Sequence, residues 1–141
     1  MENVRTTELK DADSRLLAEE AVKVLLEKKA IDVKLFGVSE ITSLTDYYVN
    51  ATGRSSTQVA SLADDLAKML GDRGRDPLRV EGRAGNSWIL VDYGDVIVNI
   101  FDRPSREFYS FDRHLPRETE IDIAALVSEV DKKFELNNAK E

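Results

Sequence analysis

The sequence predicts one α/β domain with a mixed five-stranded sheet and flanking helices. Three observations predict this class. The 141 residues are the length of a single domain with a core of its own. Apolar residues recur at helical spacing in some segments and alternate at strand spacing in others. Tight turns join several of the expected strands, and strands joined in this way pair antiparallel.

The first third of the chain predicts a helix and two strands. Residues 1–13 are polar and lack periodicity, so we expect a flexible N-terminus. Apolar residues recur at helical spacing over 14–30. Alternation over 33–38 predicts a strand, and the Tyr- and Val-rich run 46–52 predicts a second strand that closes at Gly53.

The next helix has the clearest pattern in the chain. Ser55 and Gln58 have the spacing of a capping box, in which the hydroxyl accepts from a free backbone N–H and the amide reaches back. Steps of three and four then place one apolar stripe along the helix: Val59, Leu62, Ala63, Leu66, Met69 and Leu70. Gly71 and Gly74 can end the helix in a left-handed conformation.

Three strands follow in quick succession, at 78–81, 87–92 and 95–101. The last two are joined by Asp92-Tyr93-Gly94-Asp95, which predicts a hairpin turn because Gly94 tolerates a positive φ. These elements place the consecutive strands in an antiparallel part of the sheet.

Two helices complete the pattern. Pro104 suits the first turn of a short helix over 105–111, and a last helix is expected to open at Thr119 or Glu120. The predicted organisation is listed from the N-terminus: a flexible segment 1–13, an α/β domain 14–117, and a C-terminal helix and tail 118–141.

Composition excludes several functional classes. The absence of cysteine removes disulfides, thiolate nucleophiles and Cys-ligated zinc, and the single histidine, His114, cannot form a histidine-rich metal site. A net charge of −7 disfavours broad binding to nucleic acid or to anionic membranes. No segment approaches the ~20 apolar residues of a membrane span. We expect a cytoplasmic protein with no cofactor and no metal, whose macromolecular partner is a basic protein.

Catalytic signatures are weak. The segment 51–56 holds one glycine, so it predicts a helix cap rather than a phosphate-binding loop. Asp92 and Asp95 flank a turn, where aspartate is common for local hydrogen bonding. We therefore expect no catalytic residue.

An apolar and aromatic surface is the stronger candidate site. Alternation places Trp88, Leu90 and Asp92 on one face of their strand, and both faces of the hairpin are largely apolar. An exposed apolar face with a tryptophan is typical of an interface, while Trp88 as ordinary core is the equal alternative. Farther along, Arg106 lies among aromatics and acids, which favours a protein-facing arginine that forks onto a carboxylate over RNA binding.

Several short motifs keep a fixed order along the chain. They are Asp46-Tyr47-Tyr48-Val49, Ala51-Thr52-Gly53, Ser55-Ser56, Gln58-Val59, Pro77-Leu78-Arg79-Val80-Glu81-Gly82, Trp88-Ile89-Leu90-Val91-Asp92-Tyr93-Gly94-Asp95-Val96 and Arg106-Glu107-Phe108-Tyr109. Together they resemble the ribosomal silencing factor family, also called Iojap-like, from about Leu16 to about Leu115. Asn99 stands where that family usually has histidine.

The resemblance implies a fold similar to that of nucleotidyltransferases. It also implies binding to the large ribosomal subunit through large-subunit ribosomal protein fourteen, which blocks subunit joining and represses translation under nutrient limitation. The residues that we predict to bind the partner are Trp88, Leu90, Asp92, Tyr93, Asp95, Asn99, Arg106 and Tyr109.

Two other classes stay open. A nucleotidyltransferase-like enzyme or nucleotide-binding domain would need a glycine–serine pair at a helix start and paired acids on a strand; here Arg54 separates Gly53 from Ser55, and no Asp-x-Asp pair lies on an expected strand. A homodimer with no ribosomal role is the third hypothesis.

Overall fold

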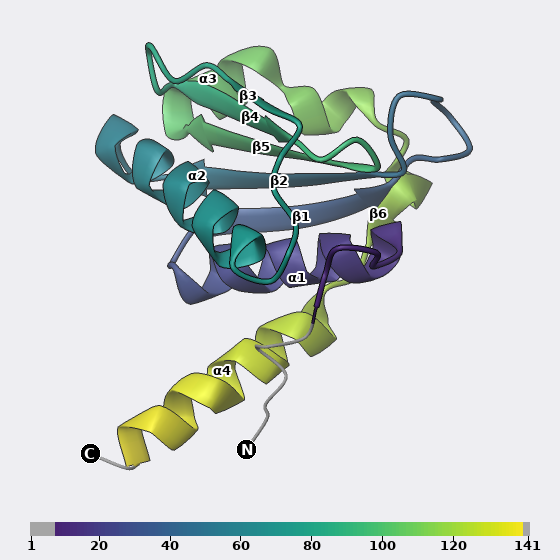
Figure 1. The fold of residues 1–141 in the computed structure, drawn as a ribbon. Coiled ribbons are helices and arrows are strands. Elements are labelled where there is room, and N and C mark those ends of the chain that lie inside the picture. Colours follow the sequence, from purple (N-terminus) through teal and green to yellow (C-terminus); the bar gives the residue numbers. More distant parts are fainter. Residues whose placement is uncertain (1–7, 140–141) are drawn as a thin grey trace.

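A six-stranded mixed sheet organises residues 8–139, the part of the chain that the computed structural model describes (Figure 1). Its strands lie in the order β3-β4-β5-β2-β1-β6. In chain order the strands are β1 (Ile31–Gly37), β2 (Tyr47–Gly53), β3 (Arg79–Glu81), β4 (Trp88–Asp92), β5 (Val96–Asp102) and β6 (Glu120–Ile121).

The two central strands are the parallel pair. β2 runs parallel to β5, with Asn50 aligned to Asn99, and every other neighbouring pair is antiparallel. A parallel pair needs a crossover connection, which helix α2 (Ser56–Gly71) and the strands β3 and β4 supply here.

Helices α1 (Ser14–Glu27) and α2 cover one face of the sheet (Figure 1). The main core lies between this face and the two helices, and its largest fully buried side chains include Leu17, Leu25, Leu35, Leu62, Leu66, Ile89 and Ile100. Asp13 and Ser55 cap the two helices, because their side chains accept hydrogen bonds from the backbone N–H groups of Leu16 and Gln58.

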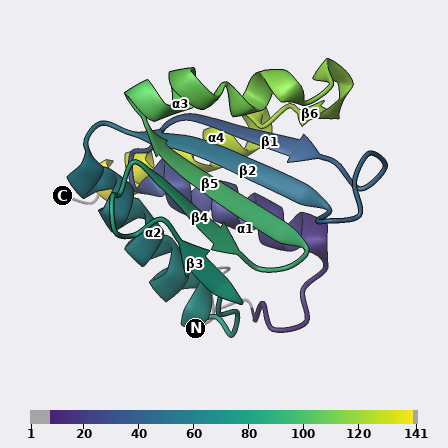
Figure 2. The same cartoon turned by 90° about the horizontal axis from the view of Figure 1, so that it is seen from above.

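The opposite face of the sheet is covered only in part. Helix α3 (Arg103–Tyr109) and two short 3₁₀ segments, Phe111–His114 and Arg117–Thr119, follow β5 and lead to β6. Seen from that side, these segments lie toward the β1 edge, and no helix lies over β3 and β4 (Figure 2). The outward side chains of β3 and β4 are therefore not covered by a helix within residues 8–139.

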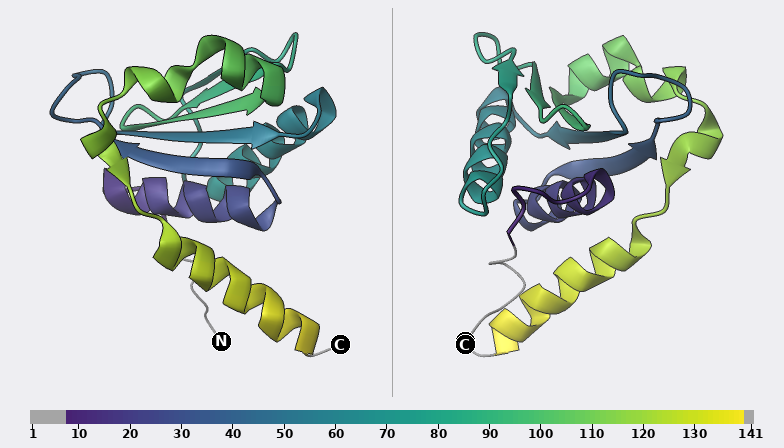
Figure 3. Two further views of the ribbon diagram at one scale, coloured as in Figure 1. Left: turned by 180° about the vertical axis from the view of Figure 1, so that it is seen from behind. Right: turned by 45° about the vertical axis from the view of Figure 1, so that its right-hand side comes forward.

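Helix α4 (Ala124–Ala139) extends away from the sheet and lies against α1 (Figure 3). Val130 is buried between them, and Lys23 on α1 pairs with Glu129 on α4 at 2.8 Å. The C-terminal helix is thus attached along one side of α1.

The expected fold class is confirmed, but the sheet has six strands rather than five. The expectation that a helix opens at Thr119 or Glu120 is wrong: Glu120 pairs with Phe36 on β1, and the last helix begins at Ala124. A two-residue strand has no local pattern of its own, since its pairing partner lies more than eighty residues away in the sequence.

The N-terminal segment also differs from the expected flexible stretch 1–13 where the structure describes it. Leu9 is fully buried in the main core, and its backbone N–H donates to the Arg73 carbonyl at 2.7 Å. A single apolar residue in a polar segment shows no periodicity, so only the tertiary structure reveals that Leu9 packs into the main core.

Candidate partner-binding surface

Strand alternation places Trp88, Leu90 and Asp92 on the face of β4 that points away from α1 and α2, because Ile89 and Val91 between them are fully buried in the main core. The three outward residues are half-buried. Across the ladder, Leu90 pairs with Glu81 and Asp92 with Arg79. We call these five residues the outer sheet face: Arg79, Glu81, Trp88, Leu90 and Asp92.

The charges of the outer sheet face are paired with one another. Arg79 donates through Nε to the Asp92 carboxylate at 2.9 Å and also pairs with Glu81. The hydrogen bond to Asp92 and the charge of Glu81 raise the pKa of Arg79. Leu90 lies beside this charged group and Trp88 follows on the same strand face, so the outer sheet face combines two largely apolar side chains with a network of paired charges.

Aromatic rings border the outer sheet face on the side of α3. The Trp88 ring lies 4.9 Å from that of Phe101 and 4.7 Å from that of Tyr109, measured between centroids. Tyr109 contacts Phe108, and these two side chains of α3 are 46% and 80% exposed. Two neighbouring exposed aromatics on a monomer are typical of a contact surface. We call Trp88, Phe108 and Tyr109 the aromatic ledge.

A chain of polar side chains runs beneath the aromatic ledge. The Trp88 indole Nε1 donates to Asn99 Oδ1 at 3.0 Å, and Asn99 Nδ2 donates to Asn50 Oδ1 at 3.0 Å. Asn50 Nδ2 then donates to the Asp112 carboxylate at 2.6 Å. Both asparagines are fully buried, and the hydrogen bonds offset the cost of burying their amides. We call Trp88, Asn99, Asn50 and Asp112 the polar relay.

Arg106 anchors the far end of the polar relay. Its Nη2 pairs with Asp112 at 2.7 Å, and its Nη1 donates to the Thr52 hydroxyl and to the Asp32 carbonyl, each at 2.9 Å. The carboxylate partner that the sequence predicted is therefore present, but the contact uses one guanidinium nitrogen rather than a fork, and it lies inside the domain because Arg106 is buried. Arg106 ties α3 to β2 and to the start of β1.

The structure gathers six of the eight expected binding residues in one region and separates the other two. Leu90, Asp92 and Tyr109 reach the surface, Trp88 lies between surface and core, and Asn99 and Arg106 lie beneath. Sequence reasoning missed Phe108, Asn50 and Asp112. Phe108 belongs to the motif Arg106-Glu107-Phe108-Tyr109, but no pattern in the sequence indicates that its ring is exposed. The contact between Asn50 and Asp112 joins segments that are far apart in the chain, so no local pattern predicts it.

Asp95 and Tyr93 lie at the hairpin turn instead. Asp95 pairs with Arg75 at 2.9 Å, and Asp92 accepts from the Gly94 N–H at 2.7 Å, so both carboxylates have structural contacts near the turn. Gly94 has the positive φ of 91° that the turn motif predicts. Tyr93 is 3% exposed and belongs to the main core, so it does not reach a partner directly.

Tyr93 gives a pH-dependent test of its burial. Burial, aided by the Asp76 carboxylate, raises the pKa of the Tyr93 phenol above its usual value of about 10. The unfolded chain therefore loses this proton first, and the stability that Tyr93 contributes is present below about pH 10 and is lost as the pH rises above it. We expect Tyr93→Phe to lessen the alkaline loss of stability, measured by urea unfolding at neutral pH and at about pH 11.

At neutral pH the same substitution is expected to change stability by at most about 1 kcal/mol, because the phenol oxygen has no hydrogen-bond partner within residues 8–139. A wild-type and a Tyr93→Phe protein with the same loss of stability in alkali would contradict the assignment.

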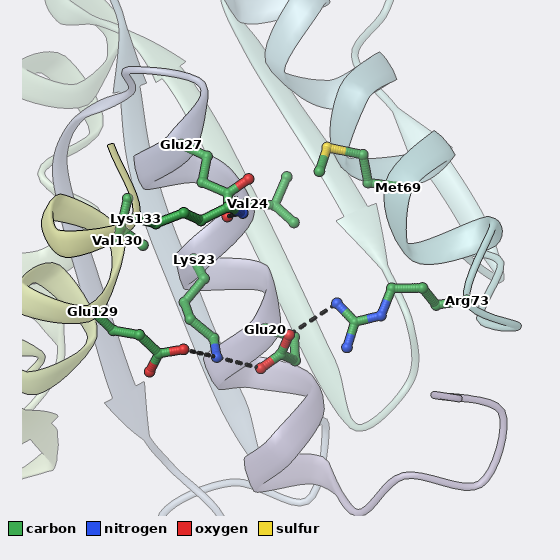
Figure 4. Close-up of a pocket in the computed structure, with 9 residues that line it drawn as sticks. All are labelled: Glu20, Lys23, Val24, Glu27, Met69, Arg73, Glu129, Val130 and Lys133. Carbon is green, nitrogen blue, oxygen red and sulfur yellow. Dashed lines mark hydrogen bonds and ion pairs between the residues drawn. The ribbon is translucent and has the colours of Figure 1, made fainter. Parts of the chain in front are cut away.

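A small concavity lies between α1, α4 and the end of α2 (Figure 4). It measures about 100 Å³, and Lys23 bridges Glu20 and Glu129 across it while Arg73 reaches Glu20 at 2.8 Å. Burial by itself would lower the pKa of Lys23, but hydrogen bonds to Glu129 and Glu20 outweigh this effect, so the pKa is raised overall. These opposite charges hold α4 to α1 and leave little space for a ligand.

The elements considered for nucleotide chemistry have structural roles. Ser55 caps α2, as the sequence predicted, and Gln58 reaches back to accept from the Arg54 N–H at 2.6 Å. Within the described part of the chain, no group of three or more His, Cys, Asp or Glu side chains is arranged to hold a metal ion. Among those same residues no helix has the length and apolar character of a membrane span.

Comparison with known proteins gives a consistent result. Residues 11–141 match the family described as ribosomal silencing factor during starvation. The chain is 35% identical over 97 residues to ribosomal silencing factor RsfS of Haemophilus influenzae, covering 69% of this chain and 95% of that protein. It is 26% identical over 95 residues to a mouse protein named mitochondrial assembly of ribosomal large subunit protein 1, covering 65% of this chain and 42% of that protein.

A solved structure agrees with the fold. A crystal structure of a Chromobacterium violaceum protein superposes with a TM-score of 0.69 at 31% identity, covering 72% of this chain and 84% of that one. The family match extends past the resemblance at about Leu115 and includes α4. Fold, ordered motifs and a match over nearly the whole length agree, and the chain belongs to the ribosomal silencing factor family.

Proposed function

We propose that this protein binds the large ribosomal subunit through the outer sheet face and the aromatic ledge, and that the bound protein blocks the joining of the small subunit. The observation that carries the proposal is the region of the sheet without a covering helix, where Leu90 shares a strand face with Trp88, whose ring contacts the exposed Tyr109. Family membership directs the proposal to the ribosome, and the name of the mouse relative refers to the large subunit. Blocking of joining would repress translation when nutrients are limited.

Within the large subunit, we propose ribosomal protein fourteen as the partner. Ribosomal proteins are typically basic, and the charge of −7 on this chain would speed the encounter with a basic surface. On the binding surface, Glu81 is an exposed carboxylate beside Leu90. An apolar anchor bordered by charge is a common arrangement at protein interfaces.

Co-sedimentation with separately purified subunits tests the proposal. We expect the protein to pellet with large subunits and not with small subunits, and to reduce the rate at which the two subunits join, measured by light scattering. Binding should weaken with added salt, but less steeply than the tenth-power dependence of a protein with extensive phosphate contacts. Equal binding to both subunits, or a stable homodimer that ignores large subunits, would overturn the proposal.

We also propose that the protein is not an enzyme. Its family name describes silencing of ribosomes, and the helix start at Ser55 is used as a cap. Mg²⁺-dependent nucleotide incorporation that is lost in Asp46→Asn would contradict this proposal.

A further inference from the structure

We propose that the polar relay positions the Trp88 indole for partner binding, so that Asn50 and Asp112 act on the binding surface without touching the partner. The inference rests on the proposed function for its binding part. It begins from the path of hydrogen bonds from β4 through β5 and β2 to the segment after α3.

The direction of this path is determined by its two ends. An indole N–H can only donate, and an ionised carboxylate can only accept. Asp112 therefore takes the amide N–H of Asn50 and leaves the Asn50 oxygen to accept from Asn99. Asn99 in turn presents its own oxygen to Trp88. Each side-chain amide is thus held in one orientation, and both amides are fully buried.

The Asp112 carboxylate is itself held in place. Arg106 pairs with its other oxygen at 2.7 Å and is fastened to β2 through the Thr52 hydroxyl. The relay therefore couples the position of the segment after α3 to the orientation of Trp88. The same segment supplies Phe111, whose ring lies 6.2 Å from that of Trp88.

Trp88 needs such support because it is only half-buried and sits at the junction of the outer sheet face and the aromatic ledge. A ring free to change rotamer would lose entropy on binding, and fixing it beforehand increases affinity. The hydrogen bond to Asn99 favours the ring orientation that points the indole N–H inward, in addition to the ring contacts with Phe101 and Tyr109.

The single tryptophan makes the inference directly measurable, because all tryptophan fluorescence reports on Trp88. We expect Asn50→Leu to free the Asn99 amide, to shift the Trp88 emission and to increase its quenching by acrylamide. The affinity for large subunits should fall about tenfold, the equivalent of one lost positioning hydrogen bond. The Asn50 side chain hydrogen-bonds to Asn99 and to Asp112, and Asn99 is the neighbour that accepts from the Trp88 indole.

Val49→Ala is the matched control. Val49 is the neighbour of Asn50 on β2, is fully buried and points to the main core. Its truncation should lower stability while leaving the emission, quenching and affinity of the folded protein unchanged. Asn99→His supplies a conservative variant, because a neutral imidazole keeps one donor and one acceptor; it should resemble the wild type more than Asn99→Leu does.

The outcomes separate the relay from the proposed function. Unchanged fluorescence in a folded Asn50→Leu overturns the relay, as does an Asn99→His protein that is no closer to the wild type than Asn99→Leu. Altered fluorescence with unchanged subunit affinity overturns the positioning role. A wild-type protein that binds no large subunits overturns the proposed function, while the fluorescence changes still establish the relay.

Discussion

Replacing Arg106 with methionine is expected to lower the free energy of unfolding by about 3–5 kcal/mol, because it breaks a buried ion pair and leaves one partner charged. Asp112 would lose its guanidinium partner at 2.7 Å, and the Asp32 carbonyl and Thr52 hydroxyl would each lose a donor at 2.9 Å. Thermal and urea unfolding would measure the change, and the melting temperature should fall by roughly 10 °C.

Two controls separate the loss of the buried ion pair from the loss of an arginine as such. Arg83→Met removes an arginine from an exposed pair with Asp64, which should leave the free energy of unfolding nearly unchanged because water screens such pairs. The double variant Arg106→Met/Asp112→Leu replaces both charges with apolar groups, and it should be more stable than Arg106→Met alone. A double variant less stable than the single one would show that Asp112 contributes mainly through Asn50.

Replacing Leu90 with arginine is expected to lower the affinity for large subunits by about 2 kcal/mol or more, which corresponds to roughly thirtyfold. The substitution places a charge at the centre of the outer sheet face, where it opposes both apolar contact and a basic partner. Leu90 is half-buried, and the region of the sheet around it is not covered by a helix, so the fold should survive. Co-sedimentation with large subunits and a melting curve would measure the two effects.

Leu136→Arg is the matched control for this prediction. Leu136 is 65% exposed on α4, which lies on the opposite side of the sheet from the outer sheet face. The same change of residue there should leave binding at the wild-type level. Normal binding by a folded Leu90→Arg would place the interface elsewhere on the molecule, and loss of binding in both variants would indicate a nonspecific effect of the added positive charge.

These variants are more informative than the substitutions that the sequence alone would favour. Trp88 is neither fully core nor fully surface, since it is half-buried, its ring lies next to three other aromatic rings and its indole donates to Asn99. Its truncation would thus change stability and binding together. Asp95 pairs with Arg75, so a lysine at this position would face an arginine and disturb the turn as well as any partner.

Local physical rules made much of the fold predictable. The Ser55 cap and the Gly94 turn depend on residues within four positions of each other, and both appear as expected. Alternation in β4 likewise assigned Trp88, Leu90 and Asp92 to one face, because side chains of a strand point to opposite sides in turn.

The sequence by itself therefore determined the fold class, the main helices, the hairpin and the sharing of one strand face by Trp88, Leu90 and Asp92, while the packing of α1 and α2 decided which face of the sheet stays uncovered. Tertiary structure alone decided that β6 pairs with β1 as an edge strand of the sheet, that Leu9 is buried in the core and that Tyr93 points inward. It also decided the polar relay, whose Asn50 and Asp112 are 62 residues apart. Periodicity and turn chemistry act between near neighbours, whereas these features depend on which distant segments the sheet and α3 bring into contact.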